Sequence, residues 1–318
     1  MYHIEKSFFE PEVRWDFYVS AKRKQIWAKE LEILIEFDRI CTKYGLQYCL
    51  DGGTLLGAVR HGGFIPWDDD LDVNMPREDY EVARQILPQE LPEIFEWQDM
   101  YTNLSHCTYE QITEYHRLPF AKIRNKNTTA IEPPPMPSSV NQGIWMDIFP
   151  LDDAVDDKGF TKEMLEMEKE LYVTVFGTEE IKEYMLSDQC NTVIPKSDLS
   201  GIMQLPYSDR FKMYEQMLIS FIGTSTNYSL KYSEILGRSN QIVNKSLYDE
   251  IIEISFEGFM AKAPAKYHEI LTTVFRGDYM IPVKTGQHNA IFNPDVPYVE
   301  YFKNPSEYKD SMIVGADA

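Results

Sequence analysis

The stretch Asp51-Gly-Gly-Thr-Leu-Leu-Gly-Ala-Val-Arg-His-Gly-Gly-Phe-Ile-Pro-Trp-Asp-Asp-Asp-Leu-Asp-Val73 decides the fold, because it joins a tight turn, a helix and an acidic strand. Gly52 and Gly53 form the expected turn, and a helix is predicted from Thr54 to Arg60. The N–H groups of such a turn can approach an anion, and the helix N-terminus adds partial positive charge. Most Gly-Gly pairs are simply turns. This one indicates a site because the acidic segment follows after a single short helix.

The acidic segment contains four carboxylates within five residues, from Asp68 to Asp72. On a strand, alternation would place Asp68, Asp70 and Asp72 on one face and Asp69 on the opposite face. A like-charge pair at ~4 Å costs about 4 kcal/mol at an effective dielectric near 20. Such an array is therefore kept where solvent separates the charges or where a cation such as Mg²⁺ neutralises them. A solvated acidic turn is the alternative, and it is the commoner role of an isolated acidic run.

A third acid and several cations complete the polar candidates. Asp147 lies in an otherwise apolar predicted strand at residues 144–149, which indicates a functional or specifically hydrogen-bonded carboxylate. Lys122 and Arg124 are two residues apart in another predicted strand, so they would share a face and could bind phosphate together. The remaining cations near the turn are Arg60 and His61. For each cation taken singly, a surface role is the alternative.

The composition limits the classes of partner. The 318 residues carry 31 Lys and Arg against 51 Asp and Glu, a net charge of −20, which argues against broad binding to nucleic acid or to acidic lipid. The length allows two domains or one elaborated domain. Residues 1–10 lack the apolar run of a signal peptide, and no stretch is apolar enough for a membrane span, so a cytoplasmic protein is expected. Without a CxxC pair, Cys41, Cys49, Cys107 and Cys190 are expected to be free thiols.

Strand patterns precede Pro150 and helix patterns follow it, which predicts an α+β fold. We expect an N-terminal helical segment (residues 1–45), a mixed-sheet catalytic core (46–152) and a mostly helical C-terminal region (153–318). The expected helices are 22–44, 77–87 (ended by Pro88), 160–176, 209–222 and 265–275. The expected strands are 47–50, the second half of 64–75, 120–124 and 144–149, the last ended by Pro150.

Residues 51–73 resemble the LicD family. Shorter supporting segments are Phe120-Ala-Lys-Ile-Arg-Asn125, Trp145-Met-Asp-Ile-Phe-Pro-Leu-Asp152 and Gly277-Asp-Tyr-Met280 with Pro282 and His288. The resemblance covers residues 12 to 152. It implies a nucleotidyltransferase-like, polymerase-beta-like core, with a glycine turn, an acid–apolar–acid strand and a third acid on a neighbouring strand.

The resemblance also implies roles for the candidate residues. Asp70 and Asp72 would bind Mg²⁺, with Mn²⁺ as an alternative, and Asp68 could be a further ligand. Asp147 would complete the metal site or accept the proton of the attacking hydroxyl. The residues expected to hold the donor are Gly52, Gly53, Thr54, Arg60, His61, Lys122 and Arg124. Trp67 and Trp145 are candidates for contact with choline, but core packing is the commoner role of tryptophan, so no choline site is assigned.

The activity that the resemblance implies is transfer of phosphocholine from CDP-choline to a hydroxyl of a cell-surface glycan precursor, of teichoic acid or lipopolysaccharide type, with release of CMP. The C-terminal region would bind the acceptor, and contact with the membrane face would be transient. Transfer of another CDP-alcohol phosphate group and true nucleotidyl transfer with pyrophosphate release are the alternatives. A member that binds nucleotide without turnover and a non-catalytic Ca²⁺-binding module are further alternatives, although the acidic run lacks the EF-hand pattern.

Overall fold

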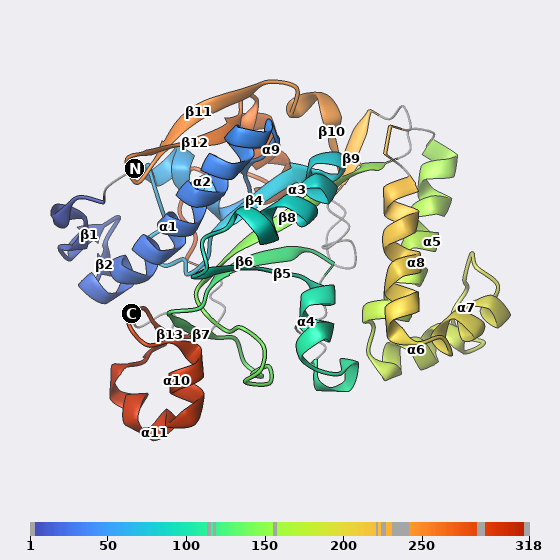
Figure 1. The fold of residues 1–318 in the computed structure, drawn as a ribbon. Helices are drawn as coiled ribbons and strands as arrows, with labels where there is room; N and C mark the ends of the chain where they lie inside the picture. Colours follow the sequence, from blue (N-terminus) through green and yellow to red (C-terminus); the bar gives the residue numbers. More distant parts are fainter. Residues whose placement is uncertain are drawn as a thin grey trace.

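A mixed seven-stranded sheet forms the centre of the molecule in the computed structural model (Figure 1). The structure describes residues 4–112, 116, 119–154, 158–220, 222–223, 227–230, 242–284 and 290–314, so His288 lies outside the described residues. The strands of this sheet are β3 (Cys49–Leu50), β4 (Asp72–Pro76), β5 (Phe95–Gln98), β6 (Ala121–Asn125), β8 (Trp145–Ala154), β9 (Tyr228–Leu230) and β10 (Ile242–Asn244). Strands β4 and β8 are parallel, and the other pairs are antiparallel. The expected α+β class is confirmed.

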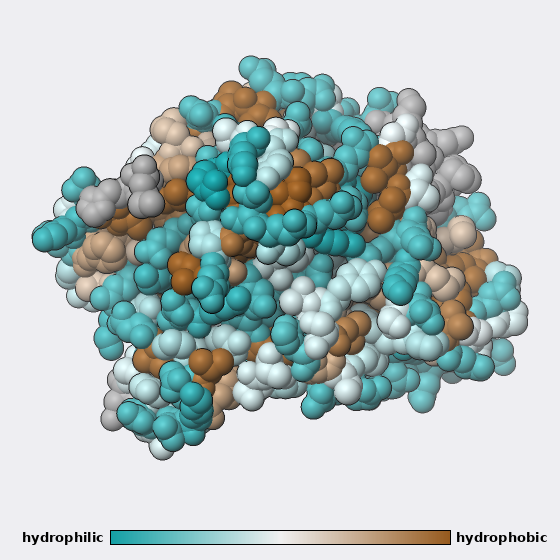
Figure 2. All heavy atoms as spheres, in the orientation of Figure 1, coloured by the Kyte–Doolittle hydropathy of each residue, from teal (hydrophilic) through white to brown (hydrophobic). Residues whose placement is uncertain are grey.

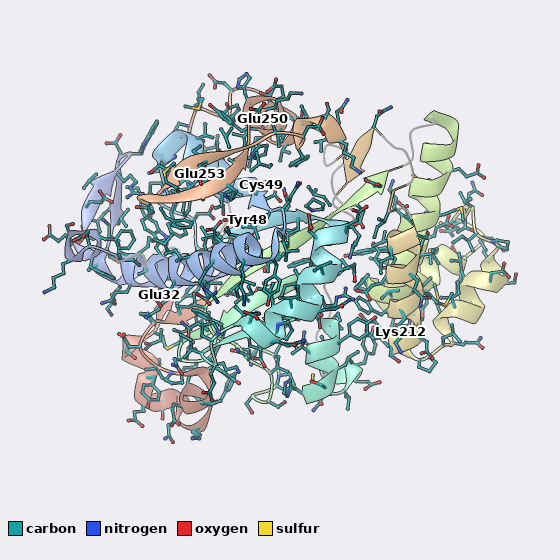
Figure 3. All side chains as sticks on the ribbon, turned by 45° about the horizontal axis from the view of Figure 1, so that its top comes forward. Glu32, Tyr48, Cys49, Lys212, Glu250 and Glu253 are labelled. Carbon is teal, nitrogen blue, oxygen red and sulfur yellow. The ribbon has the colours of Figure 1, made fainter. Side chains whose placement is uncertain are left out.

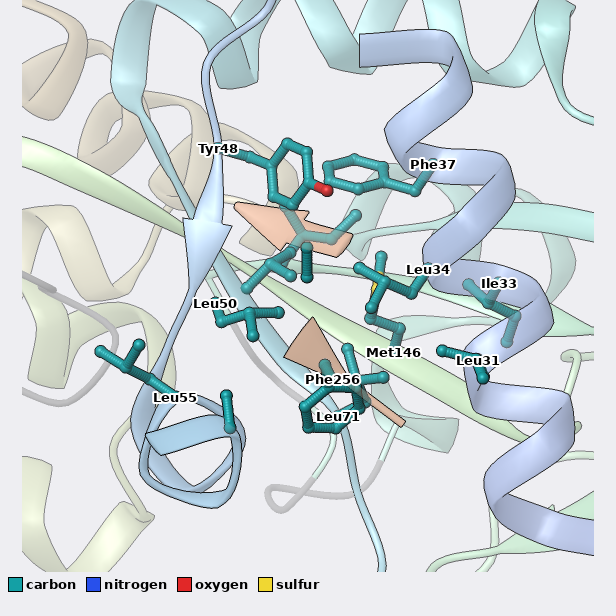
Figure 4. Packing of buried hydrophobic residues seen from close by; sticks show 14 of the residues in the cluster. Leu31, Ile33, Leu34, Phe37, Tyr48, Leu50, Leu55, Leu71, Met146 and Phe256 are labelled. Atoms are coloured by element: carbon teal, nitrogen blue, oxygen red, sulfur yellow. The ribbon is translucent and has the colours of Figure 1, made fainter. Parts of the chain in front are cut away.

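Helix α1 (Ala21–Tyr44) packs along the sheet and supplies much of the core. Its N-cap is Ser20, whose side chain accepts a hydrogen bond from the Arg23 backbone N–H. Its C-cap is Gly45, which adopts the left-handed conformation (φ 69°). Figure 4 shows its apolar side chains facing the strands and the nearby hairpin. The residues labelled there are Leu31, Ile33, Leu34, Phe37, Tyr48, Leu50, Leu55, Leu71, Met146 and Phe256. The helix expected at residues 22–44 is confirmed.

Two prolines do not end the elements they were expected to end. Pro88 lies in the last turn of α3 (Arg77–Glu90), where few helical hydrogen bonds remain to be lost. Pro150 lies within β8, where its missing N–H does no harm. Strand β6 pairs with β8 up to Ile148, and β9 pairs with it from Asp152, so Pro150 lies in the gap between these two neighbours.

The C-terminal region contains the expected helices and also several strands. The helices α5 (Lys158–Phe176), α6 (Glu179–Leu186), α7 (Lys196–Met203) and α8 (Tyr207–Ser220) gather beside the sheet, at the right of Figure 1. The chain then returns to the core with β9 and β10, the hairpin β11 (Ile251–Phe256)–β12 (Phe259–Pro264) and α9 (Tyr267–Phe275). Because β9 and β10 extend the central sheet, this region shares its structure with the preceding one.

Smaller elements complete the fold. They are η1 (Lys6–Phe9), the hairpin β1 (Glu12–Arg14)–β2 (Phe17–Val19), α4 (Met100–His106), η2 (Tyr109–Gln111), η6 (Lys245–Leu247), α10 (Tyr298–Lys303), α11 (Pro305–Tyr308), η7 (Lys309–Ser311) and a small sheet of β7 (Thr129–Ile131), β13 (Ile291–Asn293) and β14 (Ile313–Val314). Among the described residues, no helix combines the length and apolar character needed to cross a bilayer. Hydrophilic side chains cover most of the face in Figure 2, with apolar groups between them. All four cysteines are free thiols, as expected.

Candidate active site

The glycine turn forms the start of helix α2 (Gly52–His61), where it lies close to the carboxylates of Asp68 and Asp72. Gly52 has a φ of 48°, and a Cβ built on it would lie 3.3 Å from Asp72 Oδ2. A Cβ on Gly53 would lie only 2.7 Å from Asp68 Oδ2. Glycine is therefore required for the acids to approach the first turn of the helix. The Thr54 hydroxyl accepts a hydrogen bond from the Asp72 backbone N–H at 2.8 Å, so Thr54 fixes the start of β4.

Three acids from two strands meet at this turn. The parallel register places Asp72 directly opposite Asp147, so their side chains lie on the same face of the sheet. The Asp147 backbone N–H donates to the Leu71 carbonyl oxygen at 2.8 Å. Each of Asp70, Asp72 and Asp147 offers a carboxylate oxygen, and these oxygens lie within 4.8 Å of one another. The convergence that the sequence predicted is present.

The predicted alternation of faces along the acidic run is wrong. Strand β4 begins only at Asp72, so Asp68, Asp69 and Asp70 precede it and the strand period does not apply to them. Asp69, which was expected on the opposite face, is 3% exposed and forms a second group of close carboxylates with Asp68 and Asp70. Asp70 belongs to both groups. The oxygen donors of Asp70, Asp72 and Asp147 suit a hard divalent cation such as Mg²⁺.

Helix α1 donates hydrogen bonds to the backbone of the acidic segment. Arg23 donates from Nη1 to the Asp68 carbonyl oxygen at 2.8 Å, and Trp27 donates from Nε1 to the same oxygen at 3.4 Å. Glu30 is 1% exposed, and burial together with the charges of Asp70, Asp69 and Asp68 raises its pKa well above the ordinary value. These residues were missed from the sequence, because they occupy positions on a helix that otherwise shows only core periodicity.

Lys122 and Arg124 share a face of β6, as predicted, but their partners differ. Lys122 Nζ lies 3.0 Å from Asp147 Oδ1 and 3.3 Å from Glu132 Oε1. Arg124 donates to Glu132 Oε2 at 2.5 Å, and its other donors reach a glutamine side chain and a backbone carbonyl. Trp145 donates from Nε1 to Asp147 Oδ2 at 3.1 Å, and its ring lies 4.6 Å from Lys122 Nζ. Lys122 therefore belongs to the acid site, whereas Arg124 supports it through Glu132.

Glu132 is a buried carboxylate that pairs with Lys122 and Arg124, and no sequence pattern predicts this role. It follows a short strand and precedes a proline run, and nothing in that arrangement distinguishes it from a loop acid. Burial alone would raise its pKa, but the charges of Lys122 and Arg124 outweigh burial and lower the pKa to about 2.

Arg60 and His61 lie at the far end of α2 and have separate surroundings. Arg60 donates from Nη1 to the Tyr279 carbonyl oxygen at 2.7 Å. The His61 ring is 4.9 Å from the Trp15 ring and 5.9 Å from the Trp67 ring. Burial, with the charges of Arg60 and Arg14, lowers the pKa of His61 to about 4, so this imidazole is neutral at pH 7. A contact of His61 with a donor phosphate stays a prediction.

A pocket of about 360 Å³ opens beside the acids. Its lining includes Gly53, Leu56, Arg60, Ile65, Trp67 and Asp68. The remaining lining comes from the end of α9 and the segment after it: Phe275, Arg276, Asp278, Tyr279, Ile281 and Val283. A larger cavity of about 650 Å³ lies at the opposite end of β4 and β8, beside Pro76 and Leu151, away from the acid pair.

Comparison with known proteins identifies the family of this chain. Residues 45–163 match the family described as LicD/FKTN/FKRP, nucleotidyltransferase domain. The lipopolysaccharide cholinephosphotransferase LicD of Haemophilus influenzae is 30% identical over 251 residues, which cover 79% of this chain and 88% of the relative. The ribitol 5-phosphate transferase FKRP of human and of mouse is 50% identical over 42 residues, which cover 13% of this chain and 8% of those proteins. The acids, the glycine turn and the extent of these similarities show that the chain belongs to the LicD family.

Proposed function

We propose that this protein transfers phosphocholine from CDP-choline to a hydroxyl of a cell-surface glycan precursor, and that CMP is released. The observation that carries the proposal is the convergence of Asp70, Asp72 and Asp147 at the glycine turn. The near full-length similarity to a lipopolysaccharide cholinephosphotransferase supports the choice of phosphocholine. An acceptor of lipopolysaccharide type follows from that relative, and an acceptor of teichoic acid type is the alternative.

We propose that the reaction needs a divalent metal ion, because carboxylate oxygens of three acids lie within 4.8 Å of one another. Asp70, Asp72 and Asp147 would hold Mg²⁺, or Mn²⁺ in its place, with Asp68 as a further ligand. When bound, the ion would neutralise the acids and the charge that builds up on the phosphoryl oxygens. The chain's own part in the reaction is then to hold the donor and to place the acceptor.

The protein groups around the acids fit these two tasks. The N–H groups of Gly52 and Gly53 at the first turn of α2 would bind phosphate oxygens. Lys122, which already contacts Asp147, would place a positive charge beside the leaving group. Asp147 would accept the proton of the attacking hydroxyl or serve as a metal ligand. Positioning and electrostatic stabilisation together account for most of the rate enhancement in phosphoryl transfer.

The acceptor site and the cellular location are part of the same proposal. Residues 153–318 contain the helices α5 to α8, which lie beside the sheet and would contribute to acceptor binding. An acceptor linked to lipid would bring the protein into transient contact with the inner face of the membrane. We therefore place the protein in the cytoplasm, with peripheral contact at that face.

The first test is the Asp72→Asn variant, assayed for CMP release from CDP-choline with an acceptor glycan and Mg²⁺. We expect at least a hundredfold loss of rate, because the amide carries no negative charge for the cation. Asp188→Asn, at an exposed position near the end of α6, is the matched control and should keep the full rate. Full activity of Asp72→Asn would contradict the metal site, and undiminished turnover after complete chelation would remove metal from the mechanism.

Product and donor analysis separates the alternatives. Nucleotidyl transfer would take a nucleoside triphosphate as donor and release pyrophosphate in place of CMP. The short match to a ribitol 5-phosphate transferase makes CDP-ribitol the second donor to test, beside CDP-choline and CDP-glycerol. Calcium binding without turnover of any CDP-alcohol would support the non-catalytic module.

A further inference from the structure

A cation already lies between two aromatic rings beside the acid site. Lys284 Nζ lies 5.7 Å from the centre of the Phe17 ring and 5.9 Å from the centre of the Trp67 ring. These distances are within the range in which an aromatic face attracts a positive charge. The two rings meet edge to face with centroids 6.1 Å apart. Strand β2 and the segment before the acids thus form one aromatic corner that accepts a cation.

The aromatic corner adjoins the place where the donor phosphates would lie. Trp67 immediately precedes Asp68, and both line the 360 Å³ pocket together with Gly53 of the glycine turn. In CDP-choline the quaternary nitrogen is separated from the second phosphate by only two carbons and the ester oxygen. A donor whose pyrophosphate rests on the turn could therefore place this nitrogen against Trp67.

Charges of both signs surround the pocket and the aromatic corner. Asp68 and Asp278 line the pocket together with Arg60 and Arg276, and Arg23 Cζ lies 5.6 Å from the centre of the Phe17 ring. Arg60 is held by the Tyr279 carbonyl oxygen, and its charge is partly offset by Asp68. Lys284 is exposed to solvent, so its ammonium group can leave the rings for water at small cost.

We propose that Phe17 and Trp67 form the choline subsite, and that the Lys284 ammonium occupies the position the donor's trimethylammonium group takes. The inference rests on the proposed use of CDP-choline and adds the residues that select this donor. A quaternary ammonium has no N–H to donate, so aromatic faces and nearby carboxylates are the groups that can recognise it. The Lys284 ammonium group then competes with choline for this position. Donors without a cationic headgroup gain no binding affinity from the aromatic corner.

The experiment compares two donors on the full-length protein. Binding of CDP-choline and of CDP-glycerol in the presence of Mg²⁺ is measured by calorimetry for the unaltered protein and for Lys284→Met, Phe17→Leu and Phe17→Tyr. We expect Lys284→Met to tighten CDP-choline binding by roughly threefold to tenfold, because the competing cation is removed. Phe17→Leu should weaken CDP-choline binding by a similar factor, and Phe17→Tyr should retain it. CDP-glycerol binding should stay unchanged in all three variants.

The outcomes separate this inference from the proposed function. If the unaltered protein binds and turns over CDP-choline, but the variants change both donors equally or leave CDP-choline unchanged, the choline subsite is overturned and the proposed function stands. If the unaltered protein binds no CDP-choline, both fall. Lys284→Met changes an exposed residue, so its result holds even where Phe17→Leu fails to fold. Lys303→Met, on the exposed face of α10, is the control and should bind both donors normally.

Discussion

The close approach of Asp68 to Gly53 leaves no room for a side chain at position 53. In Gly53→Ala, the new methyl group must displace the Asp68 carboxylate or the first turn of α2. We expect at least a tenfold loss of transfer rate and weaker Mg²⁺ affinity, measured by titration with Mn²⁺ as a spectroscopic probe.

Gly201→Ala is the matched control for this substitution. Gly201 lies in helix α7, and a Cβ built there would meet nothing within 4 Å. Alanine at this position should leave the rate unchanged and stabilise the helix by about 0.5–1 kcal/mol. An unaltered rate and metal affinity in Gly53→Ala would show that the acids do not need their contact with the turn.

Glu132 should contribute to stability in a pH-dependent way. Its pKa is about 2 in the folded protein against an ordinary value of 4.5, so its stabilising effect is present above pH 4.5 and is lost as the pH falls through 2. We expect Glu132→Gln to lower the free energy of unfolding by about 3 kcal/mol at pH 7, and by progressively less below pH 4.5. Urea unfolding of both proteins at pH 7, 5, 4 and 3 measures this difference.

The exposed Glu253 provides the comparison for Glu132. Its carboxylate lies 3.6 Å from Lys262 Nζ in a pair open to solvent, so Glu253→Gln should change stability by less than about 1 kcal/mol at every pH. A difference between Glu132→Gln and the unaltered protein that stays constant from pH 7 to pH 3 would contradict the lowered pKa of Glu132.

The central acids could be predicted, whereas their supporting residues could not. Asp70 and Asp72 stand out in a dense acidic run, Asp147 stands out as a lone acid in an apolar strand, and the family resemblance groups the three. Arg23 reaches the carbonyl of a residue 45 positions away, and Arg60 reaches one 219 positions away. Such contacts depend on how distant elements pack, and a single sequence contains no local pattern for them.

The hairpin β11–β12 holds the far end of α2 in place. Glu257, in the turn between the two strands, accepts hydrogen bonds from Arg14 and from the Phe64 backbone N–H, and its own N–H donates to the Gly62 carbonyl. Figure 3 shows the hairpin, with Glu250 and Glu253 labelled, over the segment that carries Tyr48 and Cys49. We call these contacts of Glu257 with Arg14, Phe64 and Gly62 the clasp. The clasp links the N-terminal hairpin, the end of helix α2 and the C-terminal region.

Breaking the clasp should destabilise the protein. Glu257→Ala leaves Arg14 with Glu12 as its remaining carboxylate and leaves the Phe64 N–H without its acceptor. We expect a loss of about 2–4 kcal/mol in the free energy of unfolding, measured by urea denaturation. Glu253→Ala, on the same hairpin, should cost less than about 1 kcal/mol. Equal stability of the two variants would mean that the clasp contributes nothing.

The ends of elements are harder to predict than the elements themselves. The apolar periodicity predicts the helices α1, α3, α5, α8 and α9, and the structure contains them. The prediction that Pro150 ends a strand rests on the inability of proline to donate to a neighbour. In the structure, Pro150 lies between the segments of β8 that pair with β6 and with β9, so no neighbouring strand needs its N–H on that side. This arrangement depends on strands that are distant in the sequence.

At the scale of the whole molecule, the helices α5 to α8 gather beside the central seven-stranded sheet (Figure 1). Glu215 on α8 joins this helical group to the core, since it accepts hydrogen bonds from Arg84 of α3 and from the Tyr101 hydroxyl. The net charge of −20 argues against anionic partners. Lys122, which is buried and lies 3.0 Å from Asp147, supplies a local positive charge at the acid site.

The register between β4 and β8 has a consequence for changes in chain length. Asp72 and Asp147 meet because they are direct partners in neighbouring strands, so their alignment is fixed by counting residues along each strand. One residue inserted into β8 ahead of Asp147 would turn its carboxylate towards the opposite side of the sheet. A residue inserted into an exposed loop between the two strands leaves this count unchanged. Insertions and deletions can therefore accumulate in the connections, while the paired segments around the two acids tolerate none.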